Sequence, residues 1–564
     1  MGERLYHRLA TRNTVRLVLA PALVFIATSL DRGYQTDFWQ HLARGRLIAT
    51  EHAIVSADRF TFTVPGRPFL DNNWLTQLLY HGVHAAGGLE AVQFLNAAVL
   101  AATFALLVRL CRQTSGSTGV AAVAGVGAFF GLWQTFLIRP QSFSMLLFVV
   151  TYALLESSRR HRRLLVWVPP LLALWANVHG GFAVGLALVF AYALGATWER
   201  LRTSPPLPSA GEGRGEGEAQ EVGQRSIAAR LLRFTPYSNP LPQGERGSAV
   251  YPFALVACLV LSAIATLANP YGWNVYRYAG NLSAVGVARG IEEWLPPSIF
   301  SLTGFFLAAS IVLAITLVVA SRRRLVAKDV CLLACFAVPA CLSTRMTVWW
   351  FLASAPVLAR LAAGLIARRS AEPLPNRTSP FAAVALATIA FAAILSISWF
   401  EQYHPAMGAL RPARRTESDL QTLADRLPRG EGVPARVFTR LEWANYLAWS
   451  APDRASVFAE GRIELYPDDT WRQYLVVSGG GPGWERVLDR YGVEYLLLDD
   501  TYHRPLIDRV DQSPHWSRQG RAGSAILFAR RAGAGPGAPA TPPAPAPHGS
   551  LPPTPPGHIA GVDF

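Results

Sequence analysis

Lysine is almost absent from this sequence: Lys328 is the only lysine among its 52 basic residues, and all the others are arginine. The arginines cluster in short segments between apolar blocks, which is typical of topology signals in membrane proteins. The net charge of +15 therefore does not indicate a surface that binds nucleic acid.

Cysteine is also scarce, with five residues in or beside apolar segments. Cys331 and Cys335 are one helical turn apart, but no further Cys or His follows at the spacing of a zinc site. The cysteines give no evidence of a disulfide framework, and we interpret them as small apolar core residues.

Charged residues make up 16% of the chain, against 51% hydrophobic residues and a mean hydropathy of +0.23. A chain of 564 residues with long apolar blocks is too apolar for an ordinary soluble protein, so we predict an α-helical polytopic membrane protein. The arginines before the first block resemble the basic flank of a retained signal anchor. About eleven transmembrane helices are predicted, over residues 14–31, 89–109, 118–135, 141–157, 164–178, 181–199, 250–268, 299–320, 329–343, 347–367 and 379–399.

Arginine-rich loops are expected on the cytoplasmic side of a membrane. With a cytoplasmic N-terminus, every second loop carries a basic cluster, so the topology is self-consistent. The predicted cytoplasmic loops are residues 109–114, 159–163, 199–248, 322–328 and 368–377. The outer side then holds residues 31–73, the turn around residue 139, residues 177–181, 269–297 and 343–347, and the chain after residue 400.

The composition divides the chain into a transmembrane domain (1–400), a soluble domain (401–531) and a Pro/Ala-rich tail (532–564) predicted to be disordered. Within the first domain, residues 31–88 form an external loop with juxtamembrane helices, and residues 201–249 read as a disordered cytoplasmic insertion. The second is predicted to be a small extracytoplasmic α/β domain. Its strands are expected at 435–438, 456–459, 493–498 and 525–529, and its helices at 441–449, 471–477 and 484–491.

A carboxylate and an imidazole follow the first apolar block, at Asp37 and His41. In a helix these residues share one face, and Phe38, Trp39 and Leu42 form an adjoining apolar strip suited to the lipid interface. This geometry suits an interfacial active site. The alternative is a juxtamembrane helix whose polar face is only solvated.

Further polar residues are predicted at the same membrane face. Charged groups near the bilayer are costly unless they are paired or hydrated, so they are candidates for function. Taken singly, each has an ordinary explanation as a snorkelling side chain or a helix cap. Their convergence on one face favours a shared cavity. The set comprises Asp58, Arg139, Asn177, His179, Glu292, Glu293 and Arg345.

Such a cavity would combine two kinds of chemistry. Carboxylates and imidazoles can orient or deprotonate a hydroxyl or hold a divalent cation, and arginines can bind a phosphate. An enzyme that moves a group from a phosphate-bearing lipid to a hydroxyl needs both. Two alternatives remain: a transporter or flippase, which predicts polar residues through the middle of the spans, and a binding role for residues 400–531.

Several segments resemble the GT-C superfamily of membrane glycosyltransferases and, more narrowly, a group of bacterial polytopic membrane proteins. The resemblance implies a sugar transferred from a polyprenyl-phosphate donor to a lipid, glycan or protein acceptor at the outer face of the bacterial cytoplasmic membrane. The segments that carry it are Asp37-Phe38-Trp39-Gln40-His41-Leu42, Asp58-Arg59-Phe60-Thr61-Phe62-Thr63, Trp74-Leu75, Arg139-Pro140-Gln141, Asn177-Val178-His179-Gly180-Gly181, Asn269-Pro270-Tyr271-Gly272 and Glu460-Gly461-Arg462.

The resemblance places the catalytic or metal-binding acid at Asp37. We expect Asp37 to orient or deprotonate the acceptor with help from His41 or His179, while Arg139 and Arg345 hold the phosphate. Asn177, Glu293 and Asp58 complete the predicted substrate and phosphate site. A divalent cation such as Mg²⁺ or Mn²⁺ would bind Asp37 and take its second ligand from Asp31, Asp58 or Glu293. Position 35 is Gln where an acidic residue is usual, which favours an acid or base at Asp37 over a preformed metal site.

Overall fold

The computed structural model describes residues 9–30, 37–203, 250–321, 325–366, 378–397, 399, 415–429 and 433–531. Asp31, Gln35, most of the predicted insertion and the predicted tail lie outside the described residues. The chain divides into two compact units. We name them the helical unit (residues 1–30 and 93–404) and the mixed unit (residues 31–92 and 405–564).

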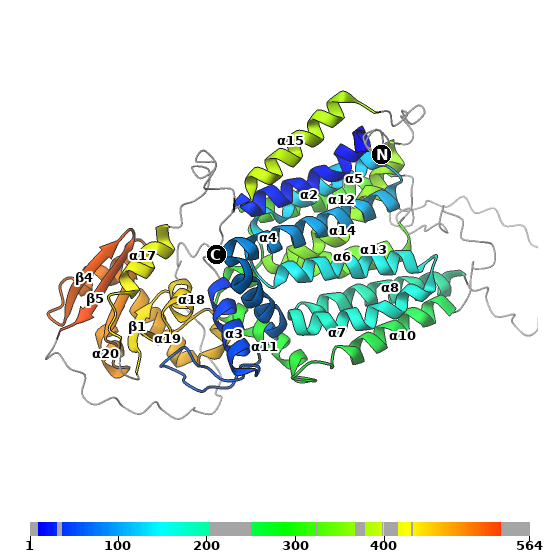
Figure 1. Cartoon of the computed structure of the whole chain (residues 1–564). Helices are drawn as coiled ribbons and strands as arrows, with labels where there is room; N and C mark the ends of the chain where they lie inside the picture. The colour runs from blue at the N-terminus through cyan, green and yellow to red at the C-terminus, as the bar shows by residue number, and fades with distance from the viewer. Residues whose placement is uncertain are drawn as a thin grey trace, which may run out of the picture. The chain divides into compact units, whose positions relative to one another are not determined.

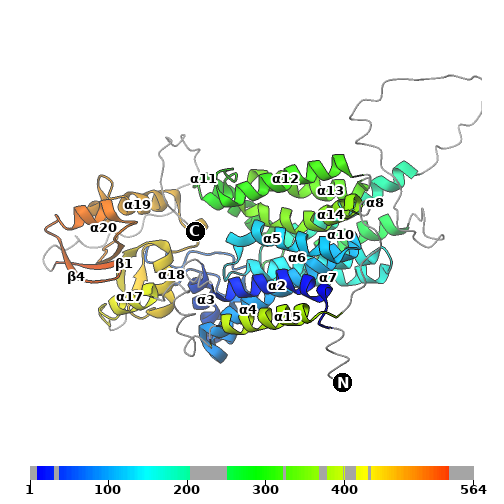
Figure 2. The same ribbon diagram turned by 90° about the horizontal axis from the view of Figure 1, so that it is seen from above.

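The helical unit is built from long apolar helices that run side by side (Figures 1 and 2). Each of the predicted spans coincides with a helix. Helix α15 packs along α2, and α8 packs against both α10 and α13. The helices are α2 (Arg12–Leu30), the later part of α4 (Trp74–Ser115), α5 (Thr118–Leu132), α6 (Gln141–Ser158), α7 (Val168–Val178), α8 (Phe182–Thr203), α10 (Val250–Ala265), α11 (Asn274–Ala288), α12 (Leu302–Ala320), α13 (Ala327–Leu342), α14 (Thr347–Ile366) and α15 (Pro380–Ser396).

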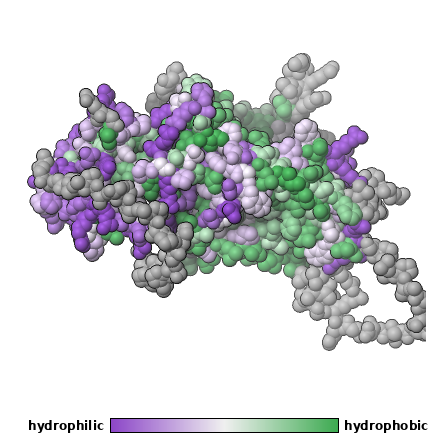
Figure 3. Space-filling model, turned by 90° about the horizontal axis from the view of Figure 1, so that it is seen from below, coloured by the Kyte–Doolittle hydropathy of each residue, from purple (hydrophilic) through white to green (hydrophobic). Residues whose placement is uncertain are grey.

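The surface of these helices is apolar, as a lipid environment requires. Six helical segments among the described residues are long and apolar enough to cross a membrane, and α10 and α15 are shorter apolar helices. Large hydrophobic side chains such as Phe253, Phe305 and Phe391 are well exposed. Hydrophobic side chains cover much of the face shown in Figure 3. A surface of this kind confirms the prediction of a polytopic membrane protein.

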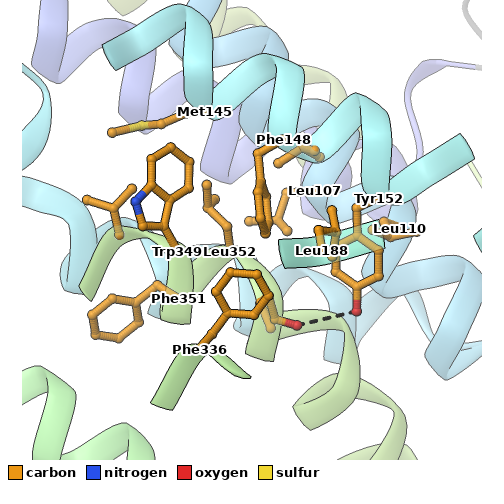
Figure 4. Packing of buried hydrophobic residues seen from close by; sticks show 14 of the residues in the cluster. Leu107, Leu110, Met145, Phe148, Tyr152, Leu188, Phe336, Trp349, Phe351 and Leu352 are labelled. Carbon is orange, nitrogen blue, oxygen red and sulfur yellow. Dashed lines mark hydrogen bonds between the residues drawn. The ribbon is translucent and has the colours of Figure 1, made fainter. Parts of the chain in front are cut away.

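Aromatic side chains fill the interior of the helical unit (Figure 4). Phe148 of α6 contacts Phe336 of α13 and Trp349 of α14, with ring centroids 5.5 and 5.4 Å apart. The hydroxyl of Tyr152 donates a hydrogen bond to the carbonyl of Ala353 at 3.3 Å, so this buried polar group is satisfied. These contacts join α6, α13 and α14 around one core.

The mixed unit begins with α3 (Phe38–Glu51) and the first part of α4. Gly87 and Gly88 interrupt α4, and Gly88 has a φ of 71°, a conformation that favours glycine. The remaining elements follow the predicted α/β pattern, although α17, α21 and β4 were not predicted. They are α17 (Arg415–Ala424), β1 (Ala435–Thr439), α18 (Leu441–Ser450), β2 (Ala455–Val457), α19 (Asp468–Ser478), α20 (Trp484–Arg490), β3 (Tyr495–Asp499), α21 (Arg504–Val510), β4 (Trp516–Ala522) and β5 (Ala525–Arg530).

The five strands form one sheet in the order β2-β1-β3-β5-β4. β1 pairs in parallel with β2 and β3, whereas β5 runs antiparallel to β3 and β4. The segment before α4 extends the β2 edge: the N–H of Val457 donates to the carbonyl of Phe60 at 3.1 Å, and the N–H of Phe62 donates to the carbonyl of Val457 at 3.2 Å. The first loop and the C-terminal α/β elements therefore form one folded unit.

The predicted lipid-facing strip on α3 is wrong. Phe38 and Leu42 are fully buried and Trp39 is nearly so. Trp39 packs edge-to-face on Tyr446 of α18, with ring centroids 5.0 Å apart, and Phe38 contacts Tyr80 of α4. Because the C-terminal elements return to cover this helix, its apolar residues form protein core.

Candidate functional site

In the helical unit, three predicted site residues meet although they come from distant parts of the sequence. Nη1 of Arg139, just before α6, donates to Oε1 of Glu293 at 2.6 Å. Nη1 of Arg345, between α13 and α14, donates to Oε2 of the same carboxylate at 3.4 Å. Glu293 lies in the short helix η3 (Glu292–Trp294), and the guanidinium of Arg345 also stacks over Trp294 at 5.0 Å. One carboxylate thus bridges two arginines.

The carboxylate of this group is ionised at neutral pH. Burial raises the pKa of Glu293, but Arg139 and Arg345 outweigh it, and the pKa falls to about 2. The two oxygens of this carboxylate are shared by two guanidinium groups. Guanidinium groups match the geometry of a phosphate, so this partly buried pair of arginines is suited to bind such an anion.

His179 lies in the loop between α7 and α8. Its Nδ1 accepts a hydrogen bond from the N–H of Gly181 at 3.0 Å, and the hydroxyl of Ser144 lies 2.8 Å from the same nitrogen. Trp175 Nε1 donates to that hydroxyl at 2.7 Å. Because Nδ1 accepts, the proton of the neutral ring lies on Nε2. Burial, followed by the charges of Arg345 and Arg139, lowers the pKa of His179 to about 3, so the ring is a neutral hydrogen-bond donor.

Asn177 has contacts typical of a structural residue. Its side-chain amide donates to the carbonyl of Ala173 at 2.9 Å, within α7, and to the carbonyl of Ala268 at 2.8 Å. It thereby ties the end of α7 to the segment that follows α10. Its predicted role in binding substrate stays a prediction.

In the mixed unit, Asp37 is the N-cap residue of α3. The turn at Gly461 approaches it closely: a Cβ at Gly461 would lie 3.2 Å from Oδ1 of Asp37, 3.0 Å from Nε2 of Gln40 and 2.9 Å from Nδ2 of Asn445. The side chain of Asn445 accepts a hydrogen bond from the N–H of Gly461 at 3.0 Å. Only glycine leaves these three polar side chains undisturbed.

His41 belongs to a buried network that the sequence analysis did not predict. Nη1 of Arg44 donates to Oδ1 of Asp71 at 3.1 Å, and Nε2 of Gln77 donates to the same oxygen at 2.7 Å. Arg44 Nη2 and Gln77 Nε2 each lie 3.3 Å from Nδ1 of His41. Because an arginine only donates, Nδ1 of His41 is an acceptor and a neutral ring carries its proton on Nε2. The position of Arg44, three residues after His41, was the available signal for this network.

Asp58 is bound by an arginine of the C-terminal elements. Arg462 donates through Nη2 to Oδ1 of Asp58 and through Nε to Oε1 of Glu460, both at 2.5 Å. The hydroxyl of Thr61 donates to Oδ2 of Asp58 at 2.7 Å. Burial raises the pKa of Glu460, Arg462 lowers it, and Asp58 raises it, with a net upward shift. Two buried carboxylates therefore share one guanidinium.

Two of the three candidate metal ligands are bound to cationic side chains. Asp58 pairs with Arg462, and Glu293 pairs with Arg139 and Arg345. Within the described part of the chain, no three His, Cys, Asp or Glu side chains group as metal ligands would. A divalent cation requires oxygen ligands that it does not share with guanidinium groups. These residues therefore do not form a ready site for Mg²⁺ or Mn²⁺, and a metal requirement stays a prediction.

The predicted site residues divide between the two units. Arg139, Asn177, His179, Glu293 and Arg345 belong to the helical unit, which brings all of these except Asn177 into one electrostatic cluster. The mixed unit contains the others, namely Asp37, His41 and Asp58. That both groups line one cavity stays a prediction.

No protein-family model matches this chain, and a comparison with curated proteins found no match. Among solved structures, it is similar to the archaeal oligosaccharyltransferase AglB from Archaeoglobus fulgidus in complex with an inhibitory peptide and a dolichol-phosphate. Identity is 14%, the TM-score is 0.46, and the match covers 86% of this chain and 69% of that chain. It is also similar to ArnT from Cupriavidus metallidurans bound to undecaprenyl phosphate, with 13% identity, a TM-score of 0.48 and coverage of 92% and 98%.

Both structures contain a bound polyprenyl phosphate, dolichol-phosphate in the first and undecaprenyl phosphate in the second. With TM-scores below 0.5 and this identity, the likeness concerns the course of the chain and identifies no site residue.

Proposed function

We propose that this multi-pass membrane protein is a glycosyltransferase that moves a sugar from a polyprenyl-phosphate-linked donor to an acceptor hydroxyl at the outer face of the bacterial cytoplasmic membrane. The observation that carries the proposal is the cluster in which Arg139 and Arg345 share Glu293. Its two guanidinium groups and its place at helix ends suit a phosphate whose lipid chain lies along apolar helices. The sequence motifs that resemble the GT-C superfamily support a sugar as the group that this phosphate carries.

Each proposed role follows from the chemistry of the group. Asp37 accepts the proton of the acceptor hydroxyl as its oxygen bonds to the anomeric carbon of the sugar. The bond between that carbon and the phosphate oxygen breaks, and the polyprenyl phosphate leaves with the electron pair. Arg139 and Arg345 stabilise the leaving phosphate, and His179 adds a neutral donor through Nε2. The acceptor is a lipid, a glycan or a protein.

Charge placement in the helical unit favours the enzyme over a transporter. Besides the arginine cluster, the described residues pair Lys328 with Glu156 and Arg360 with Asp329. Glu156 lies in the last turn of α6, whereas Arg139 precedes its first turn, about 25 Å away along a helix of 18 residues. The charged groups on α6 thus lie at its two ends, whereas a passage for a polar solute requires them along the middle.

Binding of undecaprenyl phosphate to the purified full chain tests the donor site. Loss of one charge-assisted contact is worth about 1.5–3 kcal/mol, so Arg139→Ala and Arg345→Ala should each weaken binding about 10- to 150-fold. Arg163→Ala, at an exposed arginine in the short helix η2 (Arg162–Trp167) that follows α6, is the matched control and should bind like the wild type. Equal affinity in all four proteins would remove the arginine cluster from the donor site.

Transfer is tested separately with labelled sugar incorporated into membrane extracts. Asp37→Asn keeps the size of the side chain and removes its basic oxygen, so incorporation should fall to background while binding of undecaprenyl phosphate is retained. Incorporation equal to the wild type would exclude Asp37 as the base. Accumulation of solute in sealed vesicles that survives Asp37→Asn would support transport instead.

A further inference from the structure

A pocket of about 390 Å³ opens in the mixed unit where α17 lies near α3 and α18. Its volume falls within the range of roughly 300–1,000 Å³ that is typical of small-molecule sites. None of the residues discussed as catalytic or phosphate-binding lines it. The lining residues are Trp39, Leu89, Glu417, Ser418, Gln421, Thr422, Asp425 and Tyr446.

One wall of the pocket is a row of polar side chains. Glu417 and Gln421 are one turn apart on α17, and Asp425 follows one turn later. Nε2 of Gln421 donates to Oδ1 of Asp425 at 3.1 Å, and the Tyr446 hydroxyl donates to Oε1 of Gln421 at 3.2 Å. Arg454 also donates to Oδ1 of Asp425, at 2.9 Å. The amide and the carboxylate are therefore held in fixed orientations before any ligand arrives.

The floor of the pocket is apolar. Trp39 and Tyr446 meet edge-to-face with an interplanar angle of 84°, and Leu89 from α4 adds an aliphatic surface. Because both rings are mostly buried, they are rigid and present only a small part of their surface. The pocket thus joins an apolar floor to a wall of amide, hydroxyl and carboxylate groups.

A sugar ring matches this combination, since its C–H groups are apolar and its hydroxyls both donate and accept hydrogen bonds. Among the described residues, the lining has no basic side chain and two carboxylates, of which Asp425 is paired with Arg454. The second carboxylate, Glu417, disfavours phosphates and acidic sugars. We propose that this pocket binds a neutral or amino-bearing sugar unit.

The position of the pocket also indicates what the sugar would be for. Trp39 lies in the first turn of α3, two residues after Asp37, so the pocket and the proposed base share one end of this helix, although the two side chains leave it on different faces. The pocket is then an acceptor subsite, and the acceptor is a glycan or a glycolipid. This assignment as acceptor rests on the proposed function, whereas the binding of a sugar does not.

Saturation-transfer difference NMR on the full chain tests the binding, in a detergent without a sugar headgroup. The probes are chitobiose, mannobiose, glucosamine and, as the acidic comparison, glucuronic acid. At least one neutral or amino sugar should give saturation transfer, and glucuronic acid should give none. Gln421→Ala should lower the affinity for the bound probe at least tenfold. Asp425→Asn keeps the shape of the wall and should also lower this affinity. The control Gln512→Ala, at an exposed glutamine elsewhere in the unit, should not.

The inference is overturned if no neutral or amino sugar binds, if glucuronic acid binds as well as they do, or if neither wall variant weakens binding. Asp37→Asn separates the two proposals because it should abolish transfer and leave probe binding intact. Probe binding to a chain that transfers no sugar would contradict the proposed function alone. Transfer by a chain that binds no probe would contradict this inference alone.

Discussion

Arg462 and Asp58 are 404 residues apart in the sequence, yet their side chains form a hydrogen-bonded ion pair of 2.5 Å in the mixed unit. Both are almost fully buried, as is Glu460, the second partner of Arg462. The guanidinium also stacks on Phe69 at 4.3 Å. The loop after the first predicted span and the C-terminal elements therefore depend on each other for their fold.

Removing this guanidinium should destabilise the protein strongly. Arg462→Met leaves two buried carboxylates without their cation, and breaking a buried pair costs about 3–5 kcal/mol. Thermal unfolding of the purified full chain measures the effect. Arg472→Met is the matched control, because Arg472 and Asp469 form an exposed pair with side chains 68% and 77% accessible. Such pairs contribute about 0–1 kcal/mol, so similar melting temperatures for both variants would contradict the role of Arg462.

His503 should make the stability of the mixed unit sensitive to acid. Burial and then the charge of Arg440 lower the pKa of this histidine to about 3, although Asp499 raises it. The folded state holds the ring neutral, whereas the unfolded chain takes up a proton near pH 6.5. The contribution of His503 to the free energy of unfolding is therefore fully present above pH 6.5. It is lost as the pH falls toward 3, by about 1.4 kcal/mol per pH unit.

Unfolding temperatures between pH 7.5 and 5 measure this dependence. His503→Gln removes one titrating group and should make the slope shallower, even if the variant is less stable at neutral pH. His179, whose pKa is also lowered to about 3, should keep part of the slope. His52→Asn, a change at an exposed histidine, should keep the wild-type slope. A wild-type slope in His503→Gln would assign the acid sensitivity to other groups.

Gly461 should control the position of Asp37. A Cβ at this glycine would crowd Asp37, Gln40 and Asn445 at 2.9–3.2 Å, so Gly461→Ala has to shift them by a few tenths of an ångström. Because a misplacement of 1 Å can cost about 100-fold in rate, we expect kcat to fall about tenfold with little change in KM for the lipid donor. Gly479→Ala is the control, since its Cβ would lie at an ordinary 3.4 Å from the nearest atom, a backbone oxygen. Equal kcat values for the two variants would contradict the positioning role.

The sequence predicted the helices well because hydrophobic blocks and arginine-rich loops are local signals. It also singled out Arg139, Glu293 and Arg345, since charged residues at helix ends in an apolar chain stand out, and the structure brings these three side chains together. Their role in binding phosphate stays a prediction. It failed on α3, where Phe38 and Leu42 look like an interfacial strip until residues 441–450 are known to cover them. It also failed on Arg44 and Asp71, because a buried pair 27 residues apart has no local pattern. Both failures arise from tertiary contacts that join distant segments.

His179 should act as a hydrogen-bond donor and not as a general base. Its Nδ1 already accepts from Gly181, and its pKa lies near 3, so the ring stays neutral with its proton on Nε2 throughout the range from pH 5 to 8. His179→Gln retains a donating amide and should keep more activity than His179→Phe. The transfer rates of the wild type and of His179→Gln should depend on pH in the same way. Labelled-sugar transfer measured across this pH range compares the three proteins. If a general base were lost instead, His179→Gln would be as inactive as His179→Phe, and the wild type alone would lose activity as the pH falls.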